Sequence, residues 1–377
     1  MPPSPSLTHP VCRLALGLML LLALPLSALA QIKVGQTAGF TGTVAASVKE
    51  TTDGARLYLD ALNKRGGIGG QSVELVQLDD KFDPKLAAAN AKALIDQGVI
   101  ALFLTRGTPH NQAILPLLAE AGVPLVAPST GAMLLHQPVQ RWVFNVRATY
   151  QREAERAVRH LLSVGTSRIG IVQVDDSFGD DAVQGALRGL ADKKPAVLAK
   201  YPRDKPDFAP LVAKLVAADV QAVLFLGSGT AVVDGMKALR AAGSRATLLT
   251  LSNNASSGFV KGLGEAARGT IVSQVLPPER SLAIPLVKEA TDLAHAQGQA
   301  ELTPARLEGY ASAKVLAEGL RRAAAARDLS RNGLQKALES ISRLDLGGVE
   351  LSYGANDHTG LDYADLAIVG PDGKFRR

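Results

Sequence analysis

The feature that most constrains this chain is a repeated alternation of short apolar runs with longer stretches that have helical periodicity. From Gln31 onward each β-type run is followed by a helical pattern, and the alternation restarts near residue 151. This alternation is typical of parallel sheets covered on both faces by helices. The chain has 377 residues, which is too long for one ordinary domain. We therefore expect an α/β protein with two doubly wound units.

A third stretch follows the two units and is mostly helical, so it is expected to complete them rather than to form a sheet of its own. The predicted strands lie at 32–34, 73–78, 100–105, 123–127, 168–174, 196–201, 222–226 and 246–251, with strand-like pieces at 348–353 and 364–369. The predicted helices lie at 44–64, from 83–84 to about 98, and at 109–121, 151–164, 180–190, 207–218, 230–242, 281–297, 304–326 and 331–340.

The first thirty residues differ from the rest and are predicted to be a secretory signal peptide. Their apolar run, 14–26, is shorter than the roughly 20 residues that span a bilayer. The small-x-small pattern Ala28-Leu29-Ala30 places signal-peptidase cleavage after Ala30. The alternative is an N-terminal membrane anchor. We expect an exported protein in the periplasm.

Composition argues against several chemistries. Cys12, the one cysteine, would leave with the signal peptide, so no disulfide, thiolate metal site or cysteine nucleophile is expected. The six histidines show no HxxxH or HExxH spacing, and no Walker motif or strand-linked GxGxxG is present. Without Arg13 the chain has 40 basic and 35 acidic residues, scattered and interleaved. We therefore expect no metal, no cofactor and no nucleic-acid partner.

Catalytic motifs are also missing, and we expect a protein that is not an enzyme. No G-x-S-x-G elbow occurs, and nothing places a base beside Ser228. The pair Asp79-Asp80 could perform acid–base chemistry, but on a strand-to-helix loop it is more often a turn or a cap. A periplasmic hydrolase stays open as an alternative, which turnover of amide or ester compounds would reveal.

Two strand-end loops of the first unit carry small hydroxyl residues at predicted helix starts. In open α/β sheets ligands bind at the carboxyl edge of the strands. Thr108 precedes Pro109, a residue suited to the first helical position, and free N–H groups at such a start can hold a carboxylate. Ser129, Thr130 and Gly131 follow the next strand. Together these loops predict a compact pocket for a small anionic head, although a plain helix cap is the alternative at each.

The facing unit offers further candidates at its own strand ends. Phe178 could lie over a ligand side chain, and Asp175 or Asp176 could pair with an ammonium group. The alternative for both aspartates is capping of the following helix. Ser228 and Ser252 belong to two other loops at the same edge and complete the candidate set.

At these residues the chain resembles the type I periplasmic binding proteins of the leucine/isoleucine/valine family, over nearly all of the mature sequence. The stretches that carry the resemblance are IKVGQTAGFTG (32–42), DGARLYLDALNKRGGIGGQSVELVQLDD (53–80), DPKLAAANAKALIDQGVIALF (83–103), GVPLVAPSTGA (122–132), RIGIVQVDDSFGDDAV (168–183), GYASAKVLAEGL (309–320) and LDLGGVELS (344–352). Their order and spacing together are specific.

The resemblance implies two Rossmann-like lobes that are joined by three chain crossings and close on a ligand. It places the crossings near 147–150, 275–278 and 347–353. Lobe one would comprise 31–148 and 278–347, and lobe two 149–276 and 350–377.

Site residues carry over from the family only in part. The resemblance assigns carboxylate binding to Thr108, Ser129, Thr130 and Gly131, and a covering aromatic ring to Phe178. Other family features are missing. The family has a second aromatic at the position of Ser228 or Gly229 and a bulky aromatic near the position of Ser47. Its ammonium-binding acid corresponds to a position near Ser252. Because a buried ammonium without a carboxylate partner is costly, leucine, isoleucine and valine are not expected to be the best ligands.

The resemblance also implies a function and a partner. We expect a monomeric solute-binding protein of an ABC importer that binds an amino acid or another small carboxylate and is recognised by an inner-membrane permease. The alternative is a periplasmic ligand-sensing partner of a membrane receptor.

Overall fold

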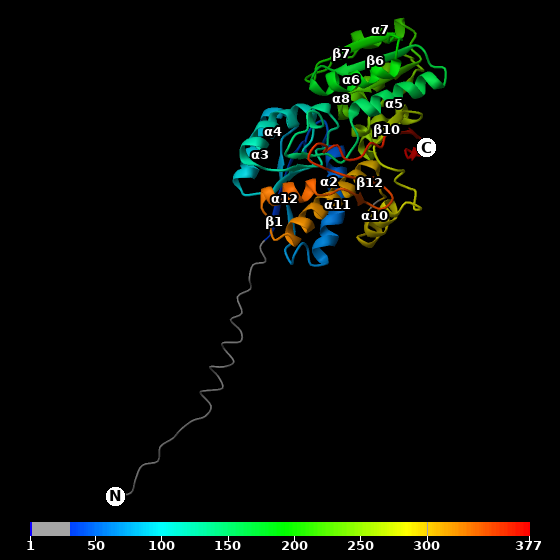
Figure 1. Ribbon diagram of the computed structural model, residues 1–377. Helices are drawn as coiled ribbons and strands as arrows, with labels where there is room; N and C mark the ends of the chain where they lie inside the picture. Colours follow the sequence, from blue (N-terminus) through cyan, green and yellow to red (C-terminus); the bar gives the residue numbers. More distant parts are fainter. Residues whose placement is uncertain (2–30, 300) are drawn as a thin grey trace.

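The computed structural model describes residues 1, 31–299 and 301–377, which form two α/β lobes (Figure 1). Residues 2–30 of the predicted signal peptide lie outside the described residues, and so does its cleavage site. Among the residues that are described, no helix has both the length and the apolar character needed to cross a membrane.

Lobe one is built on a five-stranded parallel sheet with the strand order β2-β1-β3-β4-β5. Successive residues of its strands enter different hydrophobic clusters: Ala101 and Phe103 join one cluster, and Leu102 joins the other. Side chains alternate across a strand, so helices must cover both faces of this sheet, as predicted. The strands are β1 (Ile32–Ala38), β2 (Val73–Asp79), β3 (Ala101–Phe103), β4 (Leu125–Val126) and β5 (Val143–Phe144).

The helices of lobe one come from both ends of the chain, and α11 lies beside α2 although some 250 residues separate them (Figure 1). One face of the sheet carries α3 and α4, and the other carries α2 with the later helices. The helices are α2 (Ala45–Lys64), α3 (Pro84–Asp96), α4 (Thr108–Ala121), η1 (Met133–Leu135), α10 (Pro285–Ala296), α11 (Pro304–Ala325) and α12 (Arg331–Glu339).

Helices α2 and α11 approach at two glycines. A Cβ added at Gly54 would lie 1.9 Å from the carbonyl oxygen of Arg306, and one added at Gly309 would lie 1.8 Å from that of Thr51. Next to this crossing the rings of Tyr58 and Tyr310 meet edge to face, with centroids 5.3 Å apart. Backbone contact of this kind requires residues without a side chain, so the glycines position the two helices.

Substitution of Gly309 by alanine is therefore expected to destabilise lobe one. The added methyl group must push two backbones apart, which typically costs about 1–3 kcal/mol in the free energy of unfolding. Chemical denaturation followed by circular dichroism measures this loss. Gly354→Ala is the matched control, because nothing lies within 4 Å of a Cβ there and its φ is not positive. Equal midpoints for the two variants would contradict the prediction.

Lobe two is built on a seven-stranded sheet with the order β14-β13-β10-β9-β8-β6-β7. Its strands β6 to β10 are parallel, and β13 and β14 pair antiparallel at one edge. Its strands are β6 (Ile169–Val174), β7 (Val197–Tyr201), β8 (Ala222–Leu226), β9 (Thr247–Thr250), β10 (Ile271–Gln274), β13 (Asp365–Val369) and β14 (Phe375–Arg376). Its helices are α5 (Tyr150–Ser163), α6 (Ser177–Leu190), α7 (Ala209–Ala217), α8 (Gly229–Ala241), η2 (Ser252–Asn254), α9 (Ser257–Leu263) and η3 (Gly264–Ala267).

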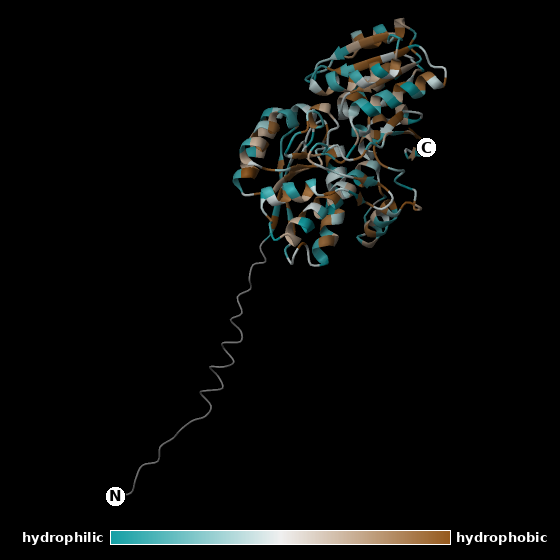
Figure 2. Ribbon diagram, viewed as in Figure 1, coloured by the Kyte–Doolittle hydropathy of each residue, from teal (hydrophilic) through white to brown (hydrophobic). Residues whose placement is uncertain are grey.

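The outer helices of both lobes carry hydrophilic as well as hydrophobic residues (Figure 2). This amphipathic character is clearest in α5, whose buried residues recur at helical spacing, among them Ala154, Ala157, Val158 and Leu161. The central strands of lobe two, in contrast, are buried throughout: every residue of β6 and of β8 is enclosed. The continuous apolar runs in the sequence correctly predicted strands of this kind.

The third chain crossing differs from the expected one at 347–353. Leu351, Tyr353 and Leu361 all belong to the hydrophobic core of lobe one, whereas residues from 350 onward were assigned to lobe two. Leu351 ends a short strand, β12 (Glu350–Leu351), that pairs with β11 (Leu344–Asp345). The chain joins the sheet of lobe two only at β13, because the apolar side chains before it pack against β5 of lobe one, as the Phe144–Tyr353 ring contact shows.

Candidate functional site

The carboxyl ends of the parallel strands in both lobes face one interlobe cleft, which is closed. The backbone N–H of Thr230 in lobe two donates to the carbonyl of Thr43 in lobe one at 3.2 Å. Glu50 of α2 accepts hydrogen bonds from the backbone N–H groups of Ser257 and Gly258 at the start of α9, each at 3.1 Å. These contacts join segments of different lobes, so the cleft is where a captured ligand would be enclosed.

Two crevices flank the Thr43 contact. One, of about 230 Å³, lies along α2 and the starts of α8 and α9, and includes Ser47. The other, of about 110 Å³, is lined by Phe82 of lobe one and by Arg203 and Ser228 of lobe two. A larger hollow of about 880 Å³ lies outside the strand ends, around α9 and the turn before β14. The two smaller crevices adjoin strand-end loops that carry polar side chains.

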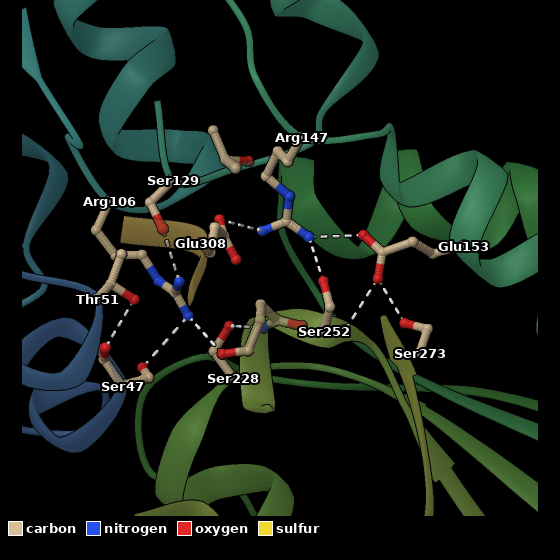
Figure 3. Close-up of polar contacts among 12 residues, drawn as sticks. Ser47, Thr51, Arg106, Ser129, Arg147, Glu153, Ser228, Ser252, Ser273 and Glu308 are labelled. Atoms are coloured by element: carbon tan, nitrogen blue, oxygen red, sulfur yellow. Dashed lines mark hydrogen bonds and ion pairs between the residues drawn. The ribbon is translucent and has the colours of Figure 1, made fainter. Parts of the chain in front are cut away.

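Arg106 is the central cationic side chain of the lobe-one half of the cleft. It follows β3 and is 4% exposed. Its guanidinium donates to Ser129 Oγ at 3.0 Å, to Ser47 Oγ at 3.4 Å and to the backbone oxygen of Asn253 in lobe two at 2.7 Å (Figure 3). Burial is the main cause that lowers its pKa; Tyr150 and Glu308 act in the opposite direction, and Arg147 adds to the lowering. All of its hydrogen-bond acceptors are neutral.

Backbone strain helps to bring Arg106 and Ser129 together. Leu104 and Ala127 directly follow β3 and β4, and both have a positive φ, 52° and 51°. Residues with a side chain rarely adopt this region, and such strain concentrates at functional sites. The turns it produces place the two loops side by side, so that Arg106 and Ser129 form an isolated parallel bridge.

A second buried guanidinium, that of Arg147, lies at the first chain crossing. Its Nη2 donates to Glu153 Oε1 at 2.6 Å and also to Ser252 Oγ, while its Nη1 lies 3.6 Å from Glu308 (Figure 3). Burial acts to lower the pKa of Arg147, but the carboxylates of Glu308 and Glu153 outweigh it, so the pKa is raised. Arg147 is therefore a structural cation with two acidic partners, unlike Arg106.

The predicted carboxylate loops of lobe one lie where the two strands end. Thr108 begins α4, and its hydroxyl lies 2.8 Å from that of Thr130. Both threonines and Ser129 are buried. Gly131 is closely covered by the crossing segment, since its Cβ would meet the carbonyl oxygen of Ala148 at 2.5 Å. The structure thus brings all four residues together beside Arg106.

The predicted lobe-two residues occupy different environments. Ser252 is buried: its backbone N–H donates to Glu153 at 2.9 Å, and its hydroxyl accepts from Arg147. Ser228 is the N-cap residue of α8 and accepts a hydrogen bond from Asn253 at 2.9 Å. Asn253 therefore joins two parts of the site. Its side-chain amide donates to Ser228, and its backbone oxygen accepts from Arg106.

Phe178 and the two aspartates lie at the start of α6. Phe178 is buried and meets the ring of Tyr150 at 4.6 Å, so its expected position over a ligand stays a prediction. Asp176 caps α6 through the N–H groups of Phe178 and Gly179, and it also pairs with Arg203. Asp175 is exposed and pairs with Lys200 at 2.9 Å. The capping interpretation thus accounts for Asp176, and neither carboxylate is free.

Sequence reasoning missed Arg106, Arg147, Glu153 and Glu308. One signal for Arg106 was available: it is a long basic residue within Thr105-Arg106-Gly107-Thr108, a strand-end loop of otherwise small residues. No comparable signal marks Glu153, which lies inside an amphipathic helix and becomes buried only because Ser252 and Ser273 of distant segments bond to it. Among the described residues, no group of three or more histidine, aspartate or glutamate side chains could hold a metal ion.

His110 and His136 are both buried. Burial lowers the pKa of each to about 4. The unfolded chain, with an ordinary value near 6.5, therefore takes up protons as the pH falls from 6.5 to 4 while the folded chain does not. Each neutral histidine therefore makes its full contribution to the free energy of unfolding above pH 6.5. This contribution is lost as the pH falls from 6.5 to 4.

We compare the free energy of unfolding of the wild type with that of His136→Gln. The wild-type value minus the variant value is expected to be about 2–3 kcal/mol lower at pH 4.5 than at pH 7. The comparison with the variant is needed because Asp80, whose pKa burial raises to about 6, acts in the opposite direction and becomes more stabilising as the pH falls from 6 to 3.8. Urea titrations at the two pH values measure the difference. A constant difference would show that His136 is not held neutral.

The fold and the cleft define a two-lobed α/β binding protein, and comparisons with known proteins agree. The model of the periplasmic binding protein family matches residues 31–374, so the chain belongs to that family. Its relatives include Leu/Ile/Val-binding proteins, and its fold is that of the type I periplasmic binding proteins. The predicted family and fold class are thereby confirmed.

Particular relatives resemble the chain over most of their length. The Leu/Ile/Val-binding protein BraC3 of Rhizobium johnstonii is 30% identical, covering 79% of this chain and 81% of that protein. The Leu/Ile/Val-binding protein of Escherichia coli K12 is 24% identical, covering 77% and 79%. A crystal structure of a substrate-binding periplasmic protein from Ralstonia solanacearum has a TM-score of 0.85 and 32% identity, covering 92% of this chain and 99% of that one.

Proposed function

We propose that this protein is the periplasmic solute-binding component of an ABC importer and that it captures a small carboxylate-bearing ligand, an amino acid or a related compound, between its lobes. The observation that carries the proposal is the convergence of buried hydroxyl groups and the Arg106 guanidinium at the strand ends of lobe one, directly opposite lobe two. Donors of this kind suit a carboxylate.

The proposal assigns the ligand carboxylate to the loops with Thr108, Ser129, Thr130 and Gly131. Phe178, Asp175, Ser228 and Ser252 are the candidates of lobe two. Binding, rather than catalysis, is proposed, with export by cleavage after Ala30, a monomeric state and an inner-membrane permease as partner. The Leu/Ile/Val-binding names of the relatives support an amino acid or a similar carboxylate as the ligand class.

A thermal-shift screen tests this function. Amino acids, aliphatic and aromatic carboxylates, amides and ureides are each added at millimolar concentration to the mature protein. A ligand that binds only the folded state stabilises it by mass action, by about 4 kcal/mol at a thousand times its Kd. At least one carboxylate is expected to raise the melting temperature. A rise with neutral amides or ureides alone would contradict the proposal.

Leucine, isoleucine and valine are expected to be poor ligands relative to others in the screen. No acid stands at Ser252, and the hydroxyl of that residue accepts a hydrogen bond from a cation, Arg147. Calorimetric titration with leucine measures this directly. Micromolar or tighter binding of leucine would refute the expectation while leaving the importer function intact.

A further inference from the structure

Arg106 lacks an acidic partner within the part of the chain that the structure describes. Its acceptors are two serine hydroxyls and one backbone oxygen. Arg147, in the same cleft, has two carboxylates within 4 Å, at 2.6 Å and 3.6 Å. The carboxylate of Glu308 acts on Arg106 only through space, and burial outweighs it. The desolvation of this guanidinium is therefore not fully compensated by negative charge.

The acids close to the two buried arginines and at the start of α6, meanwhile, have partners. Glu153 accepts from Arg147, Ser252 and Ser273, and Glu308 faces Arg147. Glu50 is occupied by the start of α9 and by the hydroxyl of Thr303 at 2.8 Å. The aspartates at the start of α6 pair with Lys200 and Arg203. Among the described residues, the strand-end part of the cleft therefore has an unneutralised cation, while its buried carboxylates already have partners. The two other acids that line the crevices, Asp204 and Asp234, are exposed to solvent.

We propose that the ligand is a carboxylate without an ammonium group, such as an oxo, hydroxy or unsubstituted carboxylic acid, and that the Arg106 guanidinium binds it. This inference rests on the proposed function and narrows its ligand class. Guanidinium matches a carboxylate with two parallel hydrogen bonds. An α-amino acid would bring an ammonium group that must be buried in the cleft, where the buried carboxylates already have partners.

The position of Arg106 also couples anion binding to closure. The guanidinium belongs to lobe one, yet its shortest hydrogen bond goes to Asn253 in lobe two. Closing the lobes removes this cation from water, and the ligand anion supplies the charge that makes its burial favourable. The ligand thus interacts more strongly with the closed state than with the open one, which is the condition for a ligand to shift such an equilibrium.

Matched ligand pairs test the inference on the intact mature protein. Calorimetric titrations compare leucine with 4-methyl-2-oxopentanoate and 4-methylpentanoate, phenylalanine with phenylpyruvate and 3-phenylpropanoate, and glutamate with 2-oxoglutarate and glutarate. In the pairs that bind, the acid without an ammonium is expected to bind at least tenfold more tightly. An amino acid that binds as tightly as its partner overturns the inference and leaves the proposed function standing. If no carboxylate binds, both fail.

Variants of Arg106 provide an independent arm, with the tightest acid of the panel as the probe. Arg106→Gln is expected to weaken binding by at least about 100-fold, because it removes one partner of a buried charge pair, and Arg106→Lys by about tenfold. The unliganded melting temperature of Arg106→Gln should be unchanged or higher, which a structural role would not produce. Arg240→Gln is the control: Arg240 also donates to backbone oxygens, those of Ser244 and Ala246, but outside the cleft. Wild-type affinity in both Arg106 variants would overturn the inference.

Discussion

Replacement of Glu153 by alanine is expected to lower the free energy of unfolding by about 3–5 kcal/mol, the usual cost of removing one member of a buried ion pair. Glu153 is fully buried and bonds to Arg147 at 2.6 Å, to the N–H of Ser252 at 2.9 Å and to the hydroxyl of Ser273 at 2.5 Å. Its loss leaves Arg147 with Glu308 alone. Urea denaturation of the mature protein measures the effect.

Glu155→Ala is the control for this prediction, since Glu155 lies on the same helix and forms ion pairs with Arg159 and Arg188, whose side chains are at least half exposed. Such pairs contribute at most about 1 kcal/mol. Glu153→Gln should fall between the two, because it keeps the shape and some of the hydrogen bonds but removes the charge. Similar losses for Glu153→Ala and Glu155→Ala would show that the Arg147 network is not electrostatically important.

Substitution of Gly229 by alanine is expected to weaken ligand binding by about 10- to 100-fold by obstructing closure of the lobes. A Cβ at Gly229 would lie 2.0 Å from the carbonyl oxygen of Thr43 in the opposite lobe. Accommodating this methyl group between the closed lobes costs about 1–3 kcal/mol, whereas the open state has no such contact. The cost therefore weakens the binding of a ligand that requires closure. Affinity is measured by calorimetry, and closure by the change in radius of gyration on adding ligand.

The backbone strain of alanine at Gly229, where φ is +59°, needs a separate control. Gly243→Ala provides it, because Gly243 also has a positive φ, +79°, but nothing lies within 4 Å of its Cβ. Both variants should lose some stability, and only Gly229→Ala should lose affinity. Full affinity with normal closure in Gly229→Ala would refute the idea that this glycine permits the lobes to meet.

The sequence predicted most of the fold because its signals are local. Buried strands such as Ile169–Val174 are continuous apolar runs, and helices such as α11 have helical periodicity and begin with a proline at the first helical position. Several elements escaped prediction, among them β5, β10, α9 and β14. They are short, and some are held by neighbours far along the chain, as in the pairing of β10 with β13.

The site was predicted less completely, because its electrostatics depend on distant residues. The hydroxyl loops of Thr108 and Ser129 could be located, since each follows a strand. The environment of Arg106 could not be predicted in this way, because its closest acceptor, Asn253, lies 147 residues further on and belongs to the other lobe. Leu351, Tyr353 and Leu361 likewise join lobe one through packing against a core that no local pattern reveals.

The sequence by itself determined the two α/β units and the strand-end loops that carry polar side chains, because hydrophobic periodicity and helix-start residues act over a few neighbouring positions. The tertiary structure alone decided which charges are compensated. Arg147 received two carboxylates and Arg106 none, and this difference depends on how two lobes and three crossings bring Glu153, Glu308 and Asn253 together. That unequal distribution of charge, rather than any motif, is what indicates the chemistry of the ligand.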